Sequence, residues 1–276
     1  MSKQGKDNNR GTDIEWEKWG QRDPYFGVLA HEKFRRQNLT EEALNEFFES
    51  GKKDVLHVLK FCRRHFDSNF SPKRVLDFGC GVGRLVIPFA GIADHVWGID
   101  VSDSMLQAAV NNCNKYFVKN ASLLKSDDDN LSALEDSFDL IHSFIVFQHL
   151  PIDRGRQIFV SLLKYLNDGG IGAIQFTYSK SSFRDTYGVL PTPSILKRFV
   201  RSVKKYVRNL LFDRLRYWAG NQSSELKDPE VQMNPYNLNE LFFILQCEGI
   251  QETYVEFTDH AGELGVYLYF RKPKRV

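Results

Sequence analysis

A short glycine-rich loop carries the strongest chemical signal in the sequence. Gly79, Gly81 and Gly83 follow a short apolar run. An acid, Asp77, stands two residues before the first of these glycines. Glycine has no Cβ, so such a loop turns tightly and lets the backbone approach a ligand closely. A helix expected to begin near Val82 adds free N–H groups and partial positive charge, so we expect a ligand at this loop.

The spacing around the loop indicates which ligand it holds. A dinucleotide fingerprint, GxGxxG, would need glycine at position 84, which is Arg84. Asp100 follows 21 residues after Gly79, at the end of the next expected strand. A carboxylate there accepts hydrogen bonds from both hydroxyls of a ribose. The acid before the loop suits a ligand that bears a cation better than a pyrophosphate, so the residues favour S-adenosylmethionine over NAD.

Short apolar runs alternate with helical stripes through the middle of the chain. The expected strands comprise residues 73–78, 95–101, 121–125, 138–147 and 171–178. The expected helices comprise residues 82–93, 103–117 and a stretch from 151 to the polar residues 167–170. Because each strand is apolar on both faces, this alternation predicts a parallel sheet covered on two sides. Two final runs, at residues 254–258 and 266–270, are joined by a short loop and predict an antiparallel hairpin.

The remaining segments complete the expected organisation. Residues 1–12 are polar and predict a disordered tail. Residues 13–72 predict a helical cover, in which Gly51 ends a helix at its C′ position. Residues 73–276 form the expected α/β domain, a doubly wound, seven-stranded, mostly parallel sheet that ends in the hairpin. A basic helical insert is expected within this domain, at residues 179–234.

Composition excludes several classes of protein. Hydrophobic residues make up 42% of the chain and charged residues 26%, which is ordinary for a globular protein. The four cysteines form no CxxC pair and have no histidine at metal-ligand spacing, so we expect reduced thiols and no metal. No stretch approaches ~18 consecutive apolar residues, and the first residues lack the apolar core of a secretory signal. We therefore expect a cytoplasmic protein.

Four segments, in order, carry a resemblance to a known family. LDFGCGVGRL, GIDVSDSML, DDDNLSALEDSFDLIHS and LNDGGIGAIQF resemble the ordered motifs of class I S-adenosylmethionine-dependent methyltransferases. They lie within residues 73–178. The segment DPYFGVLAHEKFRRQNLTEEALNEFFESG, which precedes them, is similar to bacterial methyltransferases of small molecules. The resemblance implies a Rossmann-like fold and S-adenosylmethionine as the cofactor.

The resemblance also implies roles for residues near the methionine part of the cofactor. Asp77 and the backbone of Gly79, Cys80 and Gly81 are expected against this part. Strand-end carbonyls at Ser143 and Phe144 are expected to meet the ammonium group.

Other residues are implied at the adenosine. Asp100 is expected to hold the ribose, while Val101 and Met105 flank the adenine. Asp127 is expected to accept from the adenine amino group, and Asp128 to present its backbone N–H to the ring. Because three aspartates follow one another here, the assignment shifts by one residue in the alternative register.

The N-terminal segment is rich in aromatic residues. In similar methyltransferases such a segment folds over the cofactor and closes the site. Trp19, Tyr25 and Phe26 are the candidates here, and Tyr25 is expected to contact the cofactor. Ordinary burial is the alternative for all three.

Methyl transfer needs a general base only if the acceptor arrives protonated. His149, with Gln148 beside it, lies just beyond the fourth strand and is the expected base. The alternative is that His149 orders the loop before a proline. His260, in the hairpin loop, is a weaker candidate. Arg84 either pairs with the methionine carboxylate or lies on the surface of a helix.

The acceptor is the least specified part. Within the insert, the basic stretch 194–218 is amphipathic and suggests three alternatives. Either it packs on the domain with its basic face in water, or it contacts an anionic glycan- or lipid-linked acceptor, or it lies on an anionic membrane surface. Nucleic acid is disfavoured, because the rest of the chain is net acidic and shows no RNA-binding module. The sequence makes no prediction of oligomeric state.

These observations predict a methyltransferase acting on an oxygen or nitrogen atom of a small-molecule or lipid- or glycan-linked acceptor. Two rival functions remain open. One is a regulatory or scaffold protein that binds S-adenosylmethionine without turnover. The other is an NAD-linked oxidoreductase.

Overall fold

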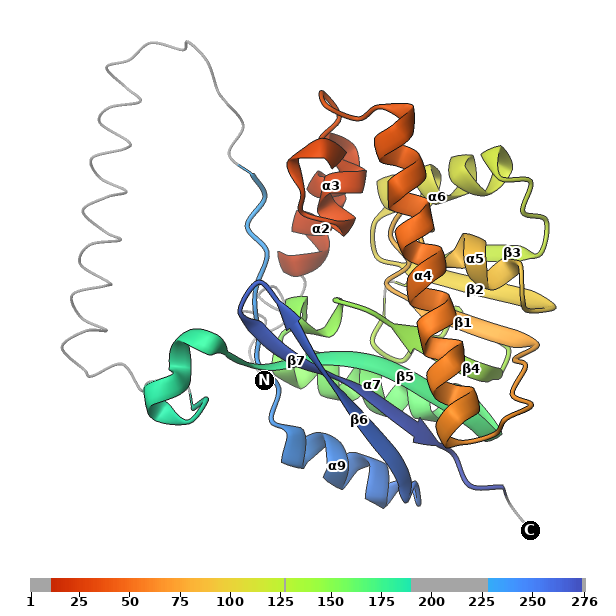
Figure 1. The fold of residues 1–276 in the computed structure, drawn as a ribbon, viewed down its shortest axis with the longest axis vertical. Coiled ribbons are helices and arrows are strands. Elements are labelled where there is room, and N and C mark those ends of the chain that lie inside the picture. Colours follow the sequence, from red (N-terminus) through yellow and green to blue (C-terminus); the bar gives the residue numbers. More distant parts are fainter. Residues whose placement is uncertain (1–10, 127, 190–227, 275–276) are drawn as a thin grey trace.

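A seven-stranded sheet organises the molecule in the computed structural model, which describes residues 11–126, 128–189 and 228–274 (Figure 1). The strand order is β3-β2-β1-β4-β5-β7-β6. The strands are β1 Arg74–Phe78, β2 His95–Asp100, β3 Ala121–Lys125, β4 Phe138–Ser143, β5 Leu166–Lys180, β6 Glu252–His260 and β7 Glu263–Arg271. The first five strands pair in parallel, whereas β7 pairs antiparallel with both β5 and β6. The predicted fold class and its terminal hairpin are confirmed.

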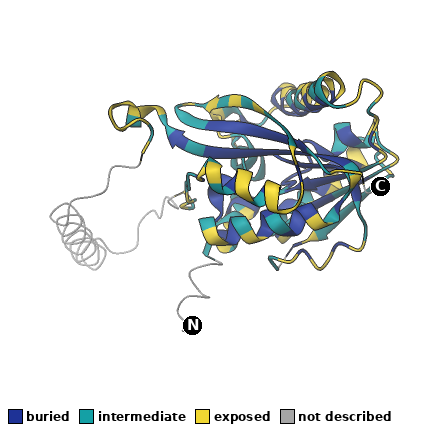
Figure 2. Cartoon of the chain, turned by 90° about the horizontal axis from the view of Figure 1, so that it is seen from below, coloured by how far each residue is buried: buried dark blue, intermediate teal, exposed yellow. Residues whose placement is uncertain are grey.

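Helices cover both faces of this sheet. The helices of the described chain are α2 Gly11–Arg22, α3 Pro24–Val28, η1 Glu32–Phe34, α4 Glu41–His65, α5 Val86–Ala90, α6 Asp103–Lys115, η2 Phe147–His149, α7 Ile152–Tyr165, η3 Ser181–Thr186 and α9 Leu238–Cys247. Side chains of α7 and α9 form a core with one face of the sheet, and those of α4, α5 and α6 form a second core with the other face. Figure 2 shows the central strands buried between helices whose outer sides are exposed, whereas the edge strands β3 and β6 are only partly covered. No helix among the described residues has both the length and the apolar character needed to cross a membrane.

The N-terminal cover packs on the domain through a third core cluster, which is rich in aromatic residues. Trp19 from α2 and Phe47 from α4 are buried in it, together with Met105 from α6. This packing joins the cover to the sheet domain beside the end of β2. Helix α2 begins at Gly11, so residues 11 and 12 of the expected tail are helical.

Several expected boundaries are wrong for identifiable reasons. Gly51 does not end a helix, because α4 continues through it to His65. It is glycine because a Cβ there would overlap the backbone carbonyl of Arg84. The helix expected near Val82 begins only at Val86, since Gly83 has a positive φ that no α-helix contains.

Two expected strands also have different ends. The strand expected at 138–147 stops at Ser143, and the chain turns at Ile145, which has φ +57°. Strand β5 begins at Leu166, directly after α7, so the polar residues 167–170 are strand rather than helix end. The basic stretch 194–218 lies outside the described residues, as do Asp127 and most of the expected insert.

Candidate functional site

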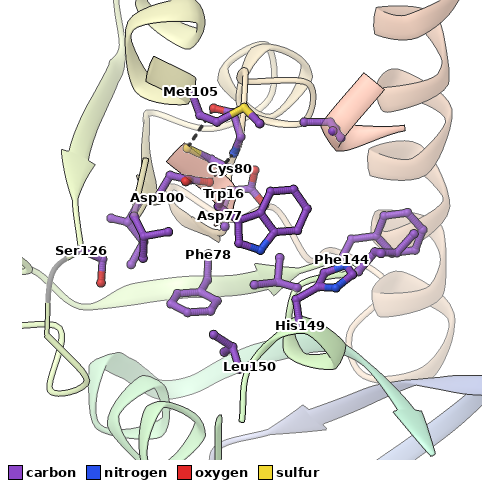
Figure 3. Close-up of a pocket in the computed structure, with 18 of the residues that line it drawn as sticks. Trp16, Asp77, Phe78, Cys80, Asp100, Met105, Ser126, Phe144, His149 and Leu150 are labelled. Atoms are coloured by element: carbon purple, nitrogen blue, oxygen red, sulfur yellow. Dashed lines mark hydrogen bonds between the residues drawn. The ribbon is translucent and has the colours of Figure 1, made fainter. Parts of the chain in front are cut away.

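A cavity opens at the carboxyl ends of β1, β2 and β4, beneath the N-terminal cover. It holds about 960 Å³ of empty space, part of it open to solvent, and the glycine loop forms one of its walls (Figure 3). This position is where parallel α/β sheets bind their ligands.

The glycine loop fits closely between two other wall segments. Gly79, Gly81 and Gly83 all have positive φ, at +74°, +52° and +82°. A Cβ on Gly79 would overlap the side chain of Val146, and one on Gly81 would lie 2.7 Å from Val28 Cγ2. Glycine is therefore required by both conformation and space at Gly79 and Gly81, and by conformation at Gly83.

Asp100 ends β2 and points its carboxylate along the cavity wall. Its Oδ2 accepts from the backbone N–H of Gly81 at 2.9 Å, and its Oδ1 accepts from that of Ser102 at 3.0 Å. Burial raises the pKa of Asp100 to about 6, even though these hydrogen bonds lower it. The carboxylate is thus held in place, and its pKa depends on the hydrogen-bond donors that a ligand adds.

Asp77, at the end of β1, has one oxygen paired and one unpaired. Its Oδ1 lies 3.0 Å from Nδ1 of His142, the residue in register with it on β4. Its Oδ2 is buried and has no hydrogen-bond partner in the described structure. Asp77 lines the cavity, so a cationic donor of a ligand would satisfy this oxygen.

Cys80 lies between these two acids, with its thiol turned against β2. Its Sγ lies 3.0 Å from where a Cβ of Gly98 would be. Burial raises the pKa of this thiol well above its ordinary value, so it remains protonated and inert. Cys80 therefore contributes to the shape of the cavity through its side chain and to the loop through its backbone.

Two of the residues expected beside the adenine line the cavity. They are Val101 and Met105, and Ser126 lines it as well. Asp128 is not among the lining residues. Its carboxylate instead accepts from the backbone N–H groups of Asn130 and Ser132.

The loop after β4 supplies the opposite wall. Phe144 lines the cavity, and its ring is stacked on that of Tyr267 with centroids 5.6 Å apart. Ser143 does not line the cavity, because its hydroxyl donates to the carbonyl of Phe78 at 3.0 Å inside the sheet. Ile145 and Val146 complete this wall.

His149 lines the cavity, but both of its ring nitrogens are engaged. Nδ1 lies 2.8 Å from the carbonyl oxygen of Gln232, which only accepts, so Nδ1 carries the proton. Nε2 then accepts from the amide nitrogen of Gln148 at 3.2 Å, and the amide oxygen of Gln148 accepts from Thr177 at 2.6 Å. Burial lowers the pKa of His149, which favours the neutral ring.

This geometry favours the loop-ordering alternative for His149. Its lone pair is free to take a proton only after Gln148 moves. Gln148 is not among the lining residues, and its side chain acts through the histidine ring. His260, the weaker candidate, has a buried Nε2 without a hydrogen-bond partner among the described residues, and its ring lies against Phe144.

Helix α2 contributes cover residues that the sequence analysis missed. Thr12, Asp13 and Trp16 line the cavity, and the Trp16 ring meets the edge of His149 with centroids 5.0 Å apart. Tyr25 is not among the lining residues, since its hydroxyl donates to Asn112 Oδ1 at 2.8 Å. The aromatic composition indicated the right segment, but only the folded helix shows that Trp16 lies on the face that lines the cavity.

Polar contacts hold this helix over the cavity. Glu17 accepts from the hydroxyls of Ser102 and Ser104 at the start of α6. Arg154 of α7 is buried and donates to Asp13 at 2.5 Å and to Asp129 at 2.7 Å. One arginine thus connects the cover helix to the segment that follows β3.

Arg84 is buried rather than on a helix surface. Its Nη1 donates to Asp54 at 2.7 Å and to the hydroxyl of Ser50 at 3.1 Å, both on α4. The residue also lines the cavity, near Phe144, whose ring centroid lies 5.7 Å from the guanidinium carbon. The surface alternative is therefore wrong.

Comparison with known proteins agrees with this geometry. Residues 75–170, which contain the glycine loop, both acids and strands β2 to β4, match the family model described as a methyltransferase domain. This part of the chain is thus similar to the domain of S-adenosylmethionine-dependent methyltransferases. S-adenosylmethionine is the cofactor that such a methyltransferase domain uses.

Curated relatives of this methyltransferase domain include two enzymes of one type. The ubiquinone biosynthesis O-methyltransferase of Rickettsia akari (strain Hartford) is 22% identical over 154 residues, which are 56% of this chain and 59% of that protein. The enzyme of the same name from Coxiella burnetii (strain Dugway 5J108-111) is 29% identical over 133 residues, 44% of this chain and 56% of that protein. The matches thus span little more than half the length of these relatives.

Solved structures share this fold. Magnesium protoporphyrin IX methyltransferase from Synechocystis PCC 6803, with bound S-adenosylmethionine, is 15% identical with a TM-score of 0.55. That comparison covers 95% of this chain and 97% of the other. The N-methyltransferase NodS from Bradyrhizobium japonicum WM9, in complex with S-adenosyl-L-homocysteine, is 15% identical with a TM-score of 0.53 and covers 94% and 100%. At such identity the likeness establishes the fold of the methyltransferase domain together with its cover.

Proposed function

We propose that this protein transfers a methyl group from S-adenosylmethionine to an oxygen or nitrogen atom of a small-molecule or lipid- or glycan-linked acceptor, in the cytoplasm. The observation that carries the proposal is the pair of acids around the glycine loop. Asp77 lines the cavity and has a buried oxygen without a partner among the described residues, and Asp100 holds a fixed carboxylate on the neighbouring strand. A ligand with a cation at one end and a ribose next to it satisfies both.

The cavity suggests how the cofactor is oriented. Asp77 receives the ammonium group, with the backbone carbonyls near Phe144 as further acceptors. Asp100 receives the ribose hydroxyls, and the adenine lies between Val101 and Met105. Arg84 has one nitrogen committed to α4, and the rest of its guanidinium group is available to the methionine carboxylate.

Two further groups of expected contacts belong to this proposal. For the adenine, the proposal keeps Asp127 as the acceptor for the amino group and the backbone N–H of Asp128 as a donor to the ring. Ser143 acts through its backbone, and Tyr25 acts by supporting α3, whose Gly27 and Val28 line the cavity.

When bound, the cofactor supplies a methyl group on a positively charged sulfur, and that charge disappears as the bond breaks. The protein's part is to hold the acceptor in line with this bond and to exclude water. Trp16, Phe144 and Val146 supply the apolar walls for this task. A protonated acceptor needs a base, and His149 serves as one if the acceptor displaces Gln148 from Nε2.

The acceptor class is proposed from the relatives and from the sequence. The curated relatives named above are O-methyltransferases, and NodS is an N-methyltransferase, which supports oxygen and nitrogen as targets. The basic stretch 194–218 supports an anionic acceptor or contact with an anionic membrane, and the net acidic remainder disfavours nucleic acid.

A second candidate is a protein that binds S-adenosylmethionine without turnover. One observation favours it, namely that both ring nitrogens of His149 are already engaged. Such a protein would need the same cofactor contacts but no base.

Calorimetry and turnover together test the proposal. Wild-type protein should bind S-adenosylhomocysteine, and Asp100→Asn should weaken this binding by roughly tenfold or more. Asp103→Asn is the matched control, because this exposed acid lies three residues away and pairs with Lys125. Transfer of label from methyl-labelled S-adenosylmethionine to a panel of phenols, amines and carboxylates then separates the two candidates. Binding without any transfer would favour the non-catalytic protein, and absence of binding would exclude both.

A further inference from the structure

His142 and Tyr267 form a buried chain of hydrogen bonds behind Asp77. The hydroxyl of Tyr267 lies 3.1 Å from His142 Nε2, and His142 Nδ1 lies 3.0 Å from Asp77 Oδ1. The histidine is 1% exposed, so water does not replace either contact. The chain connects β7, at one side of the sheet, to the cofactor wall at the end of β1.

The sheet brings these three residues together across 190 positions of sequence. Asp77 and His142 are register partners on the parallel strands β1 and β4. Strand β5 lies between β4 and β7, and its residue in register with His142 is Ala173. Because alanine has a small side chain, Tyr267 can reach over β5 to the imidazole ring.

The partners of His142 constrain where its ring carries a proton. The Asp77 carboxylate only accepts, so Nδ1 donates to it. The chain is complete with a ring that has no proton on Nε2, because this lone pair then accepts from the hydroxyl of Tyr267. Burial raises the pKa of Tyr267 well above its ordinary value, so the hydroxyl keeps the proton that it donates. The opposite tautomer would place the Nδ1 lone pair against the carboxylate.

We propose that Tyr267 fixes the tautomer of His142, and that His142 thereby holds Asp77 with its free oxygen aimed at the amino-acid part of the ligand. Both are positioning residues, since neither lines the cavity. The inference rests on the proposed function for the identity of the ligand. The chain itself is a property of the protein without ligand.

The same tyrosine connects this chain to the opposite wall. Its ring is stacked on Phe144, which lines the cavity. Replacing Tyr267 by phenylalanine retains this stacking and removes only the hydroxyl. Tyr269→Phe is the matched control, because Tyr269 is a buried tyrosine of the same strand whose hydroxyl approaches Glu256 instead.

The test compares two ligands that differ in the amino-acid part. S-adenosylhomocysteine carries it, whereas 5′-methylthioadenosine lacks it and keeps the nucleoside. We expect Tyr267→Phe to weaken the binding of S-adenosylhomocysteine by roughly fivefold, and His142→Leu to weaken it by roughly tenfold or more. The affinity for methylthioadenosine should stay unchanged in both variants. His142→Asn retains an N–H near the position of Nδ1 and should restore most of the affinity. Tyr269→Phe should bind both ligands as the wild type does.

Equal losses for both ligands, or no loss in either variant, would overturn the proposal. A second measurement does not depend on ligand or on the folding of the histidine variants. Nitrogen-15 NMR of labelled histidine in the wild type should show His142 protonated at Nδ1, and Tyr267→Phe should reduce that preference. An Nε2-protonated ring in the wild type would refute the chain directly. If the wild type bound neither ligand, the proposed function would fail while the NMR result still decided the chain.

Discussion

The raised pKa of Asp100 makes ligand affinity depend on pH in a calculable way. The carboxylate has a pKa of about 6 in the protein without ligand, because burial outweighs the hydrogen bonds from Gly81 and Ser102. Ribose hydroxyls donate to the ionised form, so binding requires loss of this proton. The dissociation constant therefore rises by the factor 1 + 10^(pKa − pH), which is about 1 at pH 8 and about 11 at pH 5. The corresponding loss of binding free energy at pH 5 is about 1.4 kcal/mol.

Calorimetry with 5′-methylthioadenosine measures this effect without the charges of the amino-acid part. At pH 6, about half a proton should be released per ligand bound, which is read from the dependence of the heat on buffer ionisation enthalpy. Asp100→Asn should bind more weakly and lose the pH step, because its amide does not titrate. An affinity that stays flat from pH 8 to pH 5 would refute the reasoning, as would a step that persists in Asp100→Asn.

Three further predictions concern the walls of the cavity. Gly79→Ala should abolish binding of S-adenosylhomocysteine by calorimetry, because its Cβ would overlap Val146 at φ +74°, and should cost about 1–3 kcal/mol in chemical denaturation. Arg154→Met should lower the free energy of unfolding by about 3 kcal/mol, since it leaves the carboxylates of Asp13 and Asp129 without their buried cation. A loss below ~1 kcal/mol would contradict the buried pairing. Burial raises the pKa of Glu17, but the hydrogen bonds from the serines of α6 outweigh it and bring the pKa to about 2. Ionised Glu17 should therefore stabilise the fold above pH 4.5 and lose this effect as the pH falls towards 2. Thermal unfolding of Glu17→Gln should therefore depend less on pH between 5 and 2 than that of the wild type.

The sheet and the glycine loop could be predicted because their signals are local. Strands apolar on both faces and glycines at fixed spacing are visible in short windows of sequence. The internal position of Gly51 in α4 could not be predicted in this way. Its cause is the carbonyl of Arg84, a contact across more than 30 residues, whereas the local pattern of a glycine after a helical run normally indicates a C′ position.

The candidate site, too, could be predicted only in part. Asp77 and Asp100 follow from spacing and Met105 from the resemblance, and all three line the cavity. Trp16 was missed because aromatic content marks a segment but not the face of the helix that meets the cavity. His142 was assigned no role, since its partners come from strands that only the folded sheet brings side by side.

The stretch from Asp228 to Tyr236 lies against the loop that carries His149. Its backbone meets the loop after β4 twice, through the carbonyl of Gln232 on His149 and the amide of Asn234 on the carbonyl of Gln148. A molecule that displaces this stretch therefore releases Nδ1 of His149 and the carbonyl of Gln148. By thermodynamic reciprocity, a molecule that binds to His149 changes the free energy of this displacement by the same amount. Binding at the histidine and the position of this stretch then belong to one equilibrium.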